Sequence, residues 1–81
     1  MYHLYILLCS DKSLYTGITN DLGKRMAAHR EGKGSKYVRS RLPFKLIYTE
    51  EHSDKSSAAK REMEIKSWDR GKKIKELELK V

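Results

Sequence analysis

Residues 4–22 constrain the fold of this chain more than any other stretch. Two short apolar runs, YHLYILL and LYTGIT, lie on either side of the polar residues 10–13. Aromatic and branched residues favour strands, and a short polar cluster between two such runs favours a tight turn. The stretch therefore predicts an antiparallel β-hairpin that leads directly into a helix start.

The pairing of Leu8 with Leu14 determines which side chains of the hairpin share a face, because side chains alternate along a strand. One face then carries Leu4, Ile6, Leu8, Leu14, Thr16 and Ile18. The opposite face carries His3, Tyr5, Leu7, Tyr15 and Gly17. The first set is explained by a hydrophobic core, whereas the second brings two phenols together beside a glycine.

The hairpin is followed by a predicted helix over residues 20–31. Thr19, Asn20 and Asp21 offer side-chain acceptors for the free N–H groups of its first turn. Arg25 and His29 are four residues apart, so they project from the same side of this helix.

The second half of the chain predicts a third strand and two more helices. Residues 44–50 alternate in the manner of a strand, and one helical turn precedes them before Pro43. Residues 53–68 contain no helix breaker, and residues 69–81 favour a short helix with a strand as the alternative. The pattern predicts an α/β (α+β) fold with a small three-stranded antiparallel sheet flanked by helices.

Length and charge restrict the class of protein. A chain of 81 residues suffices for one domain with a modest core, so we expect a single domain over residues 1–81. It has 18 Lys and Arg residues against 11 Asp and Glu, a net charge of +7. This balance favours a polyanionic partner such as nucleic acid, and solubility alone is the alternative explanation.

Cysteine content and hydropathy indicate a cytoplasmic protein. Cys9 is the single cysteine, so it has no internal disulfide partner, and one cysteine with three scattered histidines does not make a zinc site. We find no signal segment and no long apolar run, and therefore expect neither export nor membrane association.

One carboxylate falls on the apolar side of the predicted 53–68 helix. On a wheel of about 100° per residue, Glu62 lies on the side formed by Ala58, Ala59, Met63 and Ile65. Glu64 points to the opposite side. A carboxylate in a packing stripe is costly unless it is paired, hydrogen-bonded or bound to a metal. A salt bridge to Arg25 or to a lysine at the helix edge is the alternative to a metal site.

Taken singly, the other candidate residues also have structural explanations. Tyr5 and Tyr15 are common strand residues, and Gly17 could mark a bulge. Arg25 could be solvated on the helix surface, and His29 could stabilise the helix C-terminus. Only their joint spacing is specific.

That joint spacing resembles the GIY-YIG nuclease superfamily, in particular its small stand-alone bacterial members. Residues 3–5 read HLY in place of Gly-Ile-Tyr, and residues 15–17 read YTG in place of Tyr-Ile-Gly. Both tyrosines and the second glycine are retained, and the similarity spans nearly the whole chain. Ile18 stands where some members have a lysine, and an asparagine that some members carry after the glutamate has no clear match.

The resemblance implies hydrolysis of a nucleic-acid phosphodiester with one divalent cation, Mg²⁺ or Mn²⁺. It places Tyr5 and Tyr15 where the motif tyrosines contact or activate the attacking water. It places Arg25 at the phosphate-binding position and Glu62 at the metal-ligand position. His29 occupies a position that is often His or Tyr, and we rank it below Tyr15 as a candidate base. Gly17 and Asn20 receive structural roles, with Asn20 ordering the helix start.

Phosphodiester hydrolysis uses these residue types for chemical reasons as well. A lone carboxylate suits Mg²⁺, which keeps several waters and uses phosphate oxygens. An arginine offers a rigid fork of donors to the phosphate. A phenol with a pKa of about 10 is a poor base unless a cation lowers that value, and Arg25 or the metal could do so.

The sequence therefore predicts a DNA-directed endonuclease, with RNA as a further substrate to be tested. The alternative is a catalytically weak or inactive nucleic-acid-binding module with the same fold, and a protein-interaction domain is a third reading. No obligate protein partner is inferred. In either nucleic-acid reading the contacting surface comprises Lys24, Arg25, Arg30, Lys33, Lys36, Arg39 and Arg41.

Overall fold

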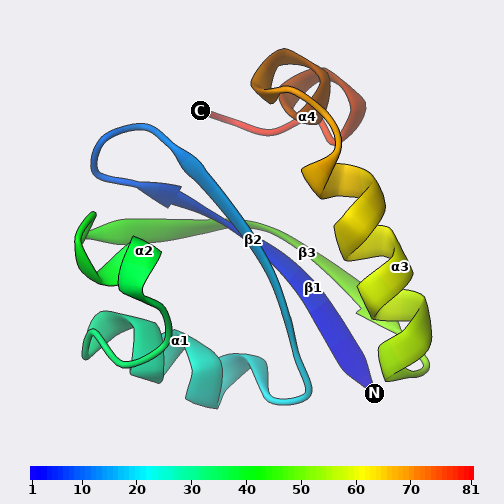
Figure 1. Cartoon of the computed structure of the whole chain (residues 1–81), viewed down its shortest axis with the longest axis horizontal. Helices are drawn as coiled ribbons and strands as arrows, with labels where there is room; N and C mark the ends of the chain where they lie inside the picture. The colour runs from blue at the N-terminus through cyan, green and yellow to red at the C-terminus, as the bar shows by residue number, and fades with distance from the viewer.

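The computed structural model describes all 81 residues, which form three strands and four helices (Figure 1). In chain order these are β1 (Tyr2–Cys9), β2 (Leu14–Thr19), α1 (Leu22–Arg30), α2 (Lys36–Arg39), β3 (Phe44–His52), α3 (Lys55–Lys66) and α4 (Arg70–Glu76). The strands make one antiparallel sheet in the order β2-β1-β3. The predicted fold class is confirmed. None of the helices combines the length and the apolar content that crossing a bilayer requires.

The hairpin has the register that the alternation predicted. Leu8 lies opposite Leu14 and Tyr5 lies opposite Gly17. The pairing of β1 with β3 has one irregularity, between Ile6 and Leu7. Gly17 therefore does not mark the bulge that its residue type alone could suggest.

Helices cover both faces of the sheet, as Figure 1 shows. The first core cluster comprises Leu4, Ile6, Ile65 and Leu79, so α3 and the C-terminal segment cover this face. The second comprises Tyr5, Leu7, Met26 and Val38, so α1 and α2 cover the other. Because β1 is central and covered on both sides, its middle is a continuous apolar run rather than an alternating one.

Each of the three longer helices begins at an aspartate. The carboxylate of Asp21 accepts a hydrogen bond from the backbone N–H of Lys24, and Asp54 and Asp69 cap α3 and α4 in the same way. Asp21, not Asn20, therefore orders the start of α1, which corrects the structural role predicted for Asn20. The two side chains are adjacent and chemically similar, and the backbone turn decides which one reaches the free N–H groups.

In the second half of the chain one expectation is wrong and another, the short last helix, is confirmed. Met63 is 71% exposed, so it does not belong to the apolar side of α3, which is formed by Ala58 and Ile65. The last segment forms α4 and ends without a strand, and Leu79 is buried after it.

Candidate functional site

A buried tyrosine–histidine pair lies at the centre of the face that α1 and α2 cover. The Tyr5 hydroxyl is 2.8 Å from Nε2 of His29, and both side chains are fully buried. Burial is the main cause that raises the pKa of Tyr5, and the Tyr15 phenol adds to it. Burial, followed by the charge of Arg25, lowers the pKa of His29. Both groups are therefore neutral near pH 7, and the hydrogen bond joins two uncharged side chains.

Two glycines make room for this pair. A Cβ atom at Gly17 would lie 2.5 Å from the Tyr5 hydroxyl, and one at Gly34 would lie 2.5 Å from Nδ1 of His29. Nδ1 of His29 has no hydrogen-bond partner, although it is buried. The retained motif glycine thus has a steric explanation: it lets strand β2 approach the Tyr5 hydroxyl.

Tyr15 connects the buried pair to the surface. It is half-buried on β2, an edge strand of the sheet. Its ring centroid lies 6.3 Å from that of Tyr5 and 5.6 Å from that of His29, while Tyr37 stacks against it at 5.8 Å. Tyr15 is the more accessible of the two motif tyrosines, so its hydroxyl is the better placed to meet a water or a ligand.

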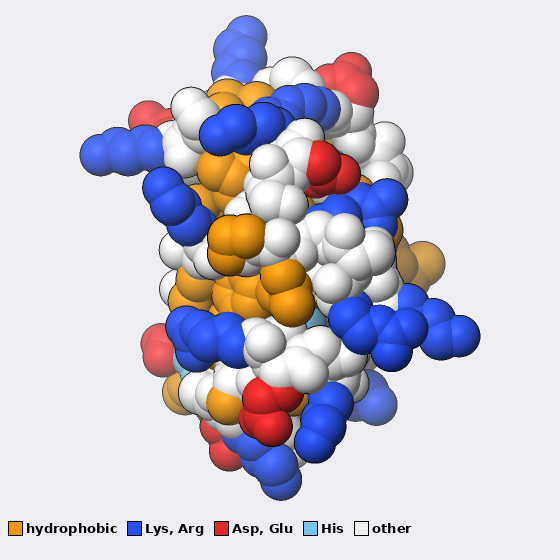
Figure 2. All heavy atoms as spheres, turned by 90° about the vertical axis from the view of Figure 1, so that its left-hand side faces the viewer, with side chains coloured by type: hydrophobic (Ala, Val, Ile, Leu, Met, Phe, Trp, Pro, Cys, Tyr) orange, Lys and Arg blue, Asp and Glu red, His pale blue; other side chains and the backbone are white.

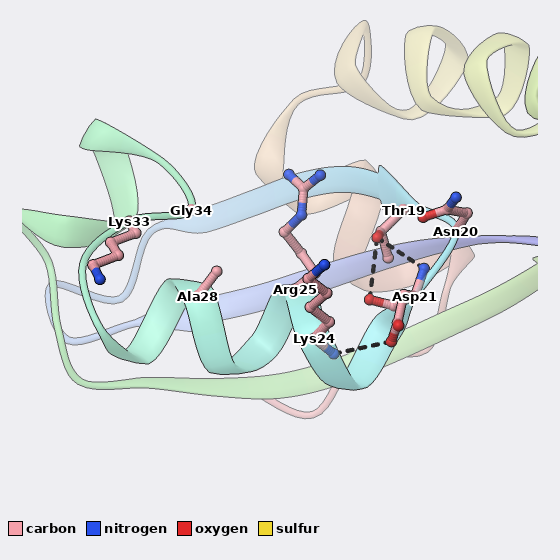
Figure 3. Close-up of a pocket in the computed structure, with 8 residues that line it drawn as sticks. All are labelled: Thr19, Asn20, Asp21, Lys24, Arg25, Ala28, Lys33 and Gly34. Carbon is pink, nitrogen blue, oxygen red and sulfur yellow. Dashed lines mark hydrogen bonds between the residues drawn. The ribbon is translucent and has the colours of Figure 1, made fainter.

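An open hollow of about 400 Å³ lies beside α1. It is lined by Thr19, Asn20, Asp21, Lys24, Arg25, Ala28, Lys33 and Gly34. Figure 3 shows Arg25 extending from α1 to the level of β2, with Thr19 and Asn20 at one end and Lys33 with Gly34 at the other. Three cations against one carboxylate make the hollow suitable for an anionic ligand.

Glu62 comes from α3, on the other side of the sheet. Its side chain is 21% exposed, and one carboxylate oxygen lies 3.2 Å from Nζ of Lys66. The charge of Glu62 is among the causes that raise the pKa of Tyr5, although it is the smallest of them. The charge of Glu62 is therefore felt weakly at Tyr5 across the sheet, and the Glu62–Lys66 salt bridge is of the kind that the sequence left open.

The donor set limits the kind of metal site that this chain could form. No group of three or more His, Cys, Asp and Glu side chains comes together as a metal site. A closed cage of protein ligands is therefore not available. A single accessible carboxylate does fit Mg²⁺ or Mn²⁺ in an open site, where waters and ligand phosphates supply the other oxygens.

The predicted cationic residues fall into three groups. Lys24 and Lys33 line the hollow, and Lys36 and Arg39 are exposed on α2. The guanidinium groups of Arg30 and Arg41 lie over aromatic rings, 5.6 Å and 3.8 Å from the ring centroids of Phe44 and Tyr37. Figure 2 shows the face with the β1–β2 turn, α2 and α1, where Lys and Arg side chains surround a central apolar area.

Three neighbours of the site were not identified from the sequence. Tyr37 stacks on Tyr15, Gly34 lies against His29, and Lys66 pairs with Glu62. Lys66 could have been found from its spacing of four residues from Glu62 on one helix. Tyr37 stands out as an aromatic residue within a basic segment, and nothing in the sequence pairs it with β2.

Known proteins share sequence and fold with this chain. Residues 1–75 match the family model described as the GIY-YIG catalytic domain. A UPF0213 protein of Lactiplantibacillus plantarum is 51% identical over 78 residues, which cover 94% of this chain and 77% of the relative. A UPF0213 protein of Staphylococcus haemolyticus is 47% identical over 77 residues, covering 95% of this chain and 94% of the relative.

A solved structure is similar over most of the fold. The solution NMR structure of a UPF0213 protein from Bacillus halodurans has a TM-score of 0.61 and 43% sequence identity. The similarity covers 93% of this chain and 81% of the other. Sequence and structure therefore lead to the same group of small proteins.

Proposed function

Because the chain belongs to the GIY-YIG domain family, we propose that it is a divalent-metal-dependent endonuclease that hydrolyses phosphodiester bonds in nucleic acid. The proposed substrate is DNA, following the family resemblance, and the proposed ion is Mg²⁺ or Mn²⁺. The relatives carry only the group name UPF0213, so the proposal rests on the family and on the residues of this chain.

The observation that supports the proposal is that the motif tyrosines and the cationic hollow meet at His29: Tyr15 packs against its ring, and Gly34, which lines the hollow, also lies against it. Tyr15 lies on edge strand β2, next to the buried Tyr5–His29 pair. Arg25, which lines the hollow, extends from α1 toward β2 (Figure 3). Glu62 approaches from α3 on the other side of the sheet. A phosphate in the hollow would meet fixed positive charge, as phosphoryl transfer requires.

Burial gives the two motif tyrosines different roles in the proposed reaction. Tyr5 is fully buried with a raised pKa, so it stays protonated and orients His29. Tyr15 is half-exposed and would orient the attacking water through its hydroxyl. His29 has no exposed surface, so we place it behind Tyr15 as a support rather than in contact with the water.

Arg25 and Glu62 would act on the phosphate from opposite sides. Arg25 is half-exposed, and its guanidinium would offer parallel donors to two non-bridging oxygens. A divalent cation bound at Glu62 would supply further neutralisation of charge on the phosphate and the leaving oxygen. Lys66 would have to release the carboxylate of Glu62, which the 52% exposure of its own side chain allows.

The test is cleavage of plasmid DNA, and of DNA and RNA oligonucleotides, in Mg²⁺ or Mn²⁺. We expect Glu62→Gln and Arg25→Ala each to lower the rate by roughly two to three orders of magnitude, the loss seen for one transition-state contact. Glu64→Gln is the matched control, because Glu64 lies on the same helix but is exposed and bound to Arg61. Absence of cleavage by the wild type, or equal cleavage by Glu62→Gln, would refute the proposal.

A second candidate function is nucleic-acid binding without catalysis. The Glu62–Lys66 salt bridge favours it, because a paired carboxylate needs no metal. Such a module would bind DNA or RNA with the same affinity in EDTA, and binding would weaken steeply with salt. It would also tolerate Glu62→Gln, so the same variant separates the two functions.

A further inference from the structure

Tyr37 is an exposed aromatic residue for which the proposed mechanism has not yet given a role. It lies on α2, and 38% of its surface is accessible to solvent. Its ring stacks on Tyr15 with the centroids 5.8 Å apart and the planes at 29°. Tyr15 is thus enclosed by three rings, with Tyr5 and His29 behind it and Tyr37 beside it.

Tyr37 is itself held by a second residue, Arg41. The guanidinium carbon of Arg41 lies 3.8 Å from the ring centroid of Tyr37, which is a close cation–π contact. One guanidinium nitrogen of Arg41 also donates to the backbone carbonyl of Tyr37 at 3.0 Å. Arg41 therefore holds both the ring and the backbone of Tyr37.

The β1–β2 turn anchors Arg41 in turn. Nε of Arg41 donates to a carboxylate oxygen of Asp11 at 3.0 Å, and the backbone carbonyl of Arg41 accepts from Ser10 at 3.0 Å. Asp11 also accepts hydrogen bonds from the backbone and side chain of Ser13. A continuous series of contacts, which we call the Tyr37 brace (Asp11, Arg41 and Tyr37), thus runs from the hairpin turn to Tyr15.

We propose that Tyr37 is a positioning residue for Tyr15, and that the Asp11–Arg41 ion pair keeps Tyr37 in place. The inference rests on the proposed nuclease function and assigns it a further residue. A phenol on an edge strand would otherwise be free to sample several rotamers toward solvent. The brace keeps the Tyr15 ring in one orientation, so its hydroxyl faces the reacting water without reordering.

The competing role for an exposed tyrosine in a basic segment is direct contact with nucleic acid. The Tyr37 ring already has two partners, the Tyr15 ring and the Arg41 guanidinium. A nucleic-acid base that stacked on Tyr37 would have to compete with these contacts. This geometry favours positioning over contact.

The kinetic test compares Tyr37→Leu with Tyr37→Phe. Tyr37→Leu removes the stack, and we expect kcat to fall roughly threefold to tenfold with KM unchanged, as the loss of one aromatic pair would give. Tyr37→Phe keeps both ring contacts and should match the wild type. A rise in KM with unchanged kcat in Tyr37→Leu would overturn the inference in favour of substrate contact.

A readout that needs no activity is the NMR spectrum of labelled tyrosine rings, with Tyr15 assigned through Tyr15→Phe. We expect the Tyr15 ring signals to shift in Tyr37→Leu and, to a smaller extent, in Arg41→Lys and Asp11→Asn. Tyr48→Phe is the control, because Tyr48 lies on β3 and packs against the other core cluster. Unmoved Tyr15 signals in folded Tyr37→Leu would overturn the inference.

The two readouts separate this inference from the proposed function. If the wild type cleaves no nucleic acid, the nuclease proposal fails, and the Tyr15 signals alone decide whether the brace orders that ring. Because Tyr37 is exposed, we expect Tyr37→Leu to fold, and its amide spectrum will show whether it does.

Discussion

The two faces of the sheet bury polar groups in different ways. On the α1–α2 face, Tyr5 and His29 are fully enclosed, neutral and joined by one hydrogen bond of 2.8 Å. On the α3–α4 face, Glu50 accepts hydrogen bonds from Tyr48 and Arg61 and lies 3.0 Å from Nε2 of His52. The side chains of Glu50 and Arg61 are 18% and 28% exposed, so water still reaches this network.

The two faces therefore depend on different effects: close packing around a neutral pair on one face, and charge in a partly solvated network on the other. A neutral pair with no water must have its shape matched by its neighbours, and two glycines provide that match. A charged network at the rim has several partners, so it tolerates the loss of one. The enclosed pair supports Tyr15 at the proposed site, whereas the charged network joins β3 to α3, the helix that carries Glu62.

The largest expected effect comes from filling the space at Gly17. Gly17→Ala would place a Cβ atom 2.5 Å from the Tyr5 hydroxyl, and we expect a loss of about 2 kcal/mol in the free energy of unfolding. Gly23→Ala is the matched control: its Cβ atom would meet only Asp21, at 3.9 Å, within α1. Removing this helical glycine should stabilise the protein by up to about 1 kcal/mol.

Urea denaturation of both alanine variants will show whether Gly17→Ala lowers the free energy of unfolding while Gly23→Ala raises it. Adding Tyr5→Phe to Gly17→Ala removes the nearest atom, so the double variant should recover part of the loss. Equal effects of the two alanine substitutions would show that the close fit around Tyr5 is not what stabilises this face.

A smaller effect is expected when each face loses a phenol hydroxyl. Tyr5→Phe leaves Nε2 of His29 buried without its partner, which should cost about 1–2 kcal/mol of unfolding free energy. Tyr48→Phe leaves Glu50 with Arg61 at 2.9 Å and with His52, so we expect a loss below about 1 kcal/mol. The two variants are to be compared by thermal and urea unfolding. A larger loss in Tyr48→Phe would contradict the comparison.

The strand register and the separation of the two faces could be predicted from the sequence. Side chains alternate between the two faces of a strand, so pairing Leu8 with Leu14 was enough to place Tyr5 opposite Gly17 and on the same face. The hydrogen bond between Tyr5 and His29 could not be predicted, because it depends on how α1 packs against the sheet. Both residues were proposed from motif spacing without knowledge of their burial.

Other features depend on geometry that local patterns do not contain. The helical wheel placed Met63 on the apolar side of α3, yet it is 71% exposed, because the sheet covers a narrower arc of the helix than the apolar residues span. Tyr37 reaches Tyr15 only through the path of the chain after α1, where Gly32 has a positive φ of 78°. The position of Glu62 relative to Arg25 likewise depends on helices from opposite faces.

The smallest expected effect is on the pH dependence of the free energy of unfolding, which should change in a different pH range for each face. The pKa of His29 is lowered from its ordinary value of 6.5 by burial and by Arg25, so the unfolded chain binds a proton there that the folded chain does not. Stability therefore falls as the pH drops below about 6.5, with a slope of at most about 1.4 kcal/mol per pH unit for one group. Burial raises the pKa of Glu50, but hydrogen bonds from Arg61 outweigh burial and bring the pKa below its ordinary value of 4.5. The stability that ionised Glu50 contributes is therefore complete above pH 4.5 and is lost as the pH falls below that value.

Unfolding free energies from pH 7.5 to 3.5 will separate the two pH ranges. His29→Gln should flatten the slope below pH 6.5, and Glu50→Gln should flatten the slope below pH 4.5. Asp11→Asn is a necessary control, because hydrogen bonds from Ser13 also lower the pKa of Asp11 and add to the effect in the lower pH range. If His29→Gln left the upper slope unchanged, the neutral state assigned to the Tyr5–His29 pair would be wrong. Tyr15 would then lie against a charged imidazolium, and the contrast between the two faces would lose its basis.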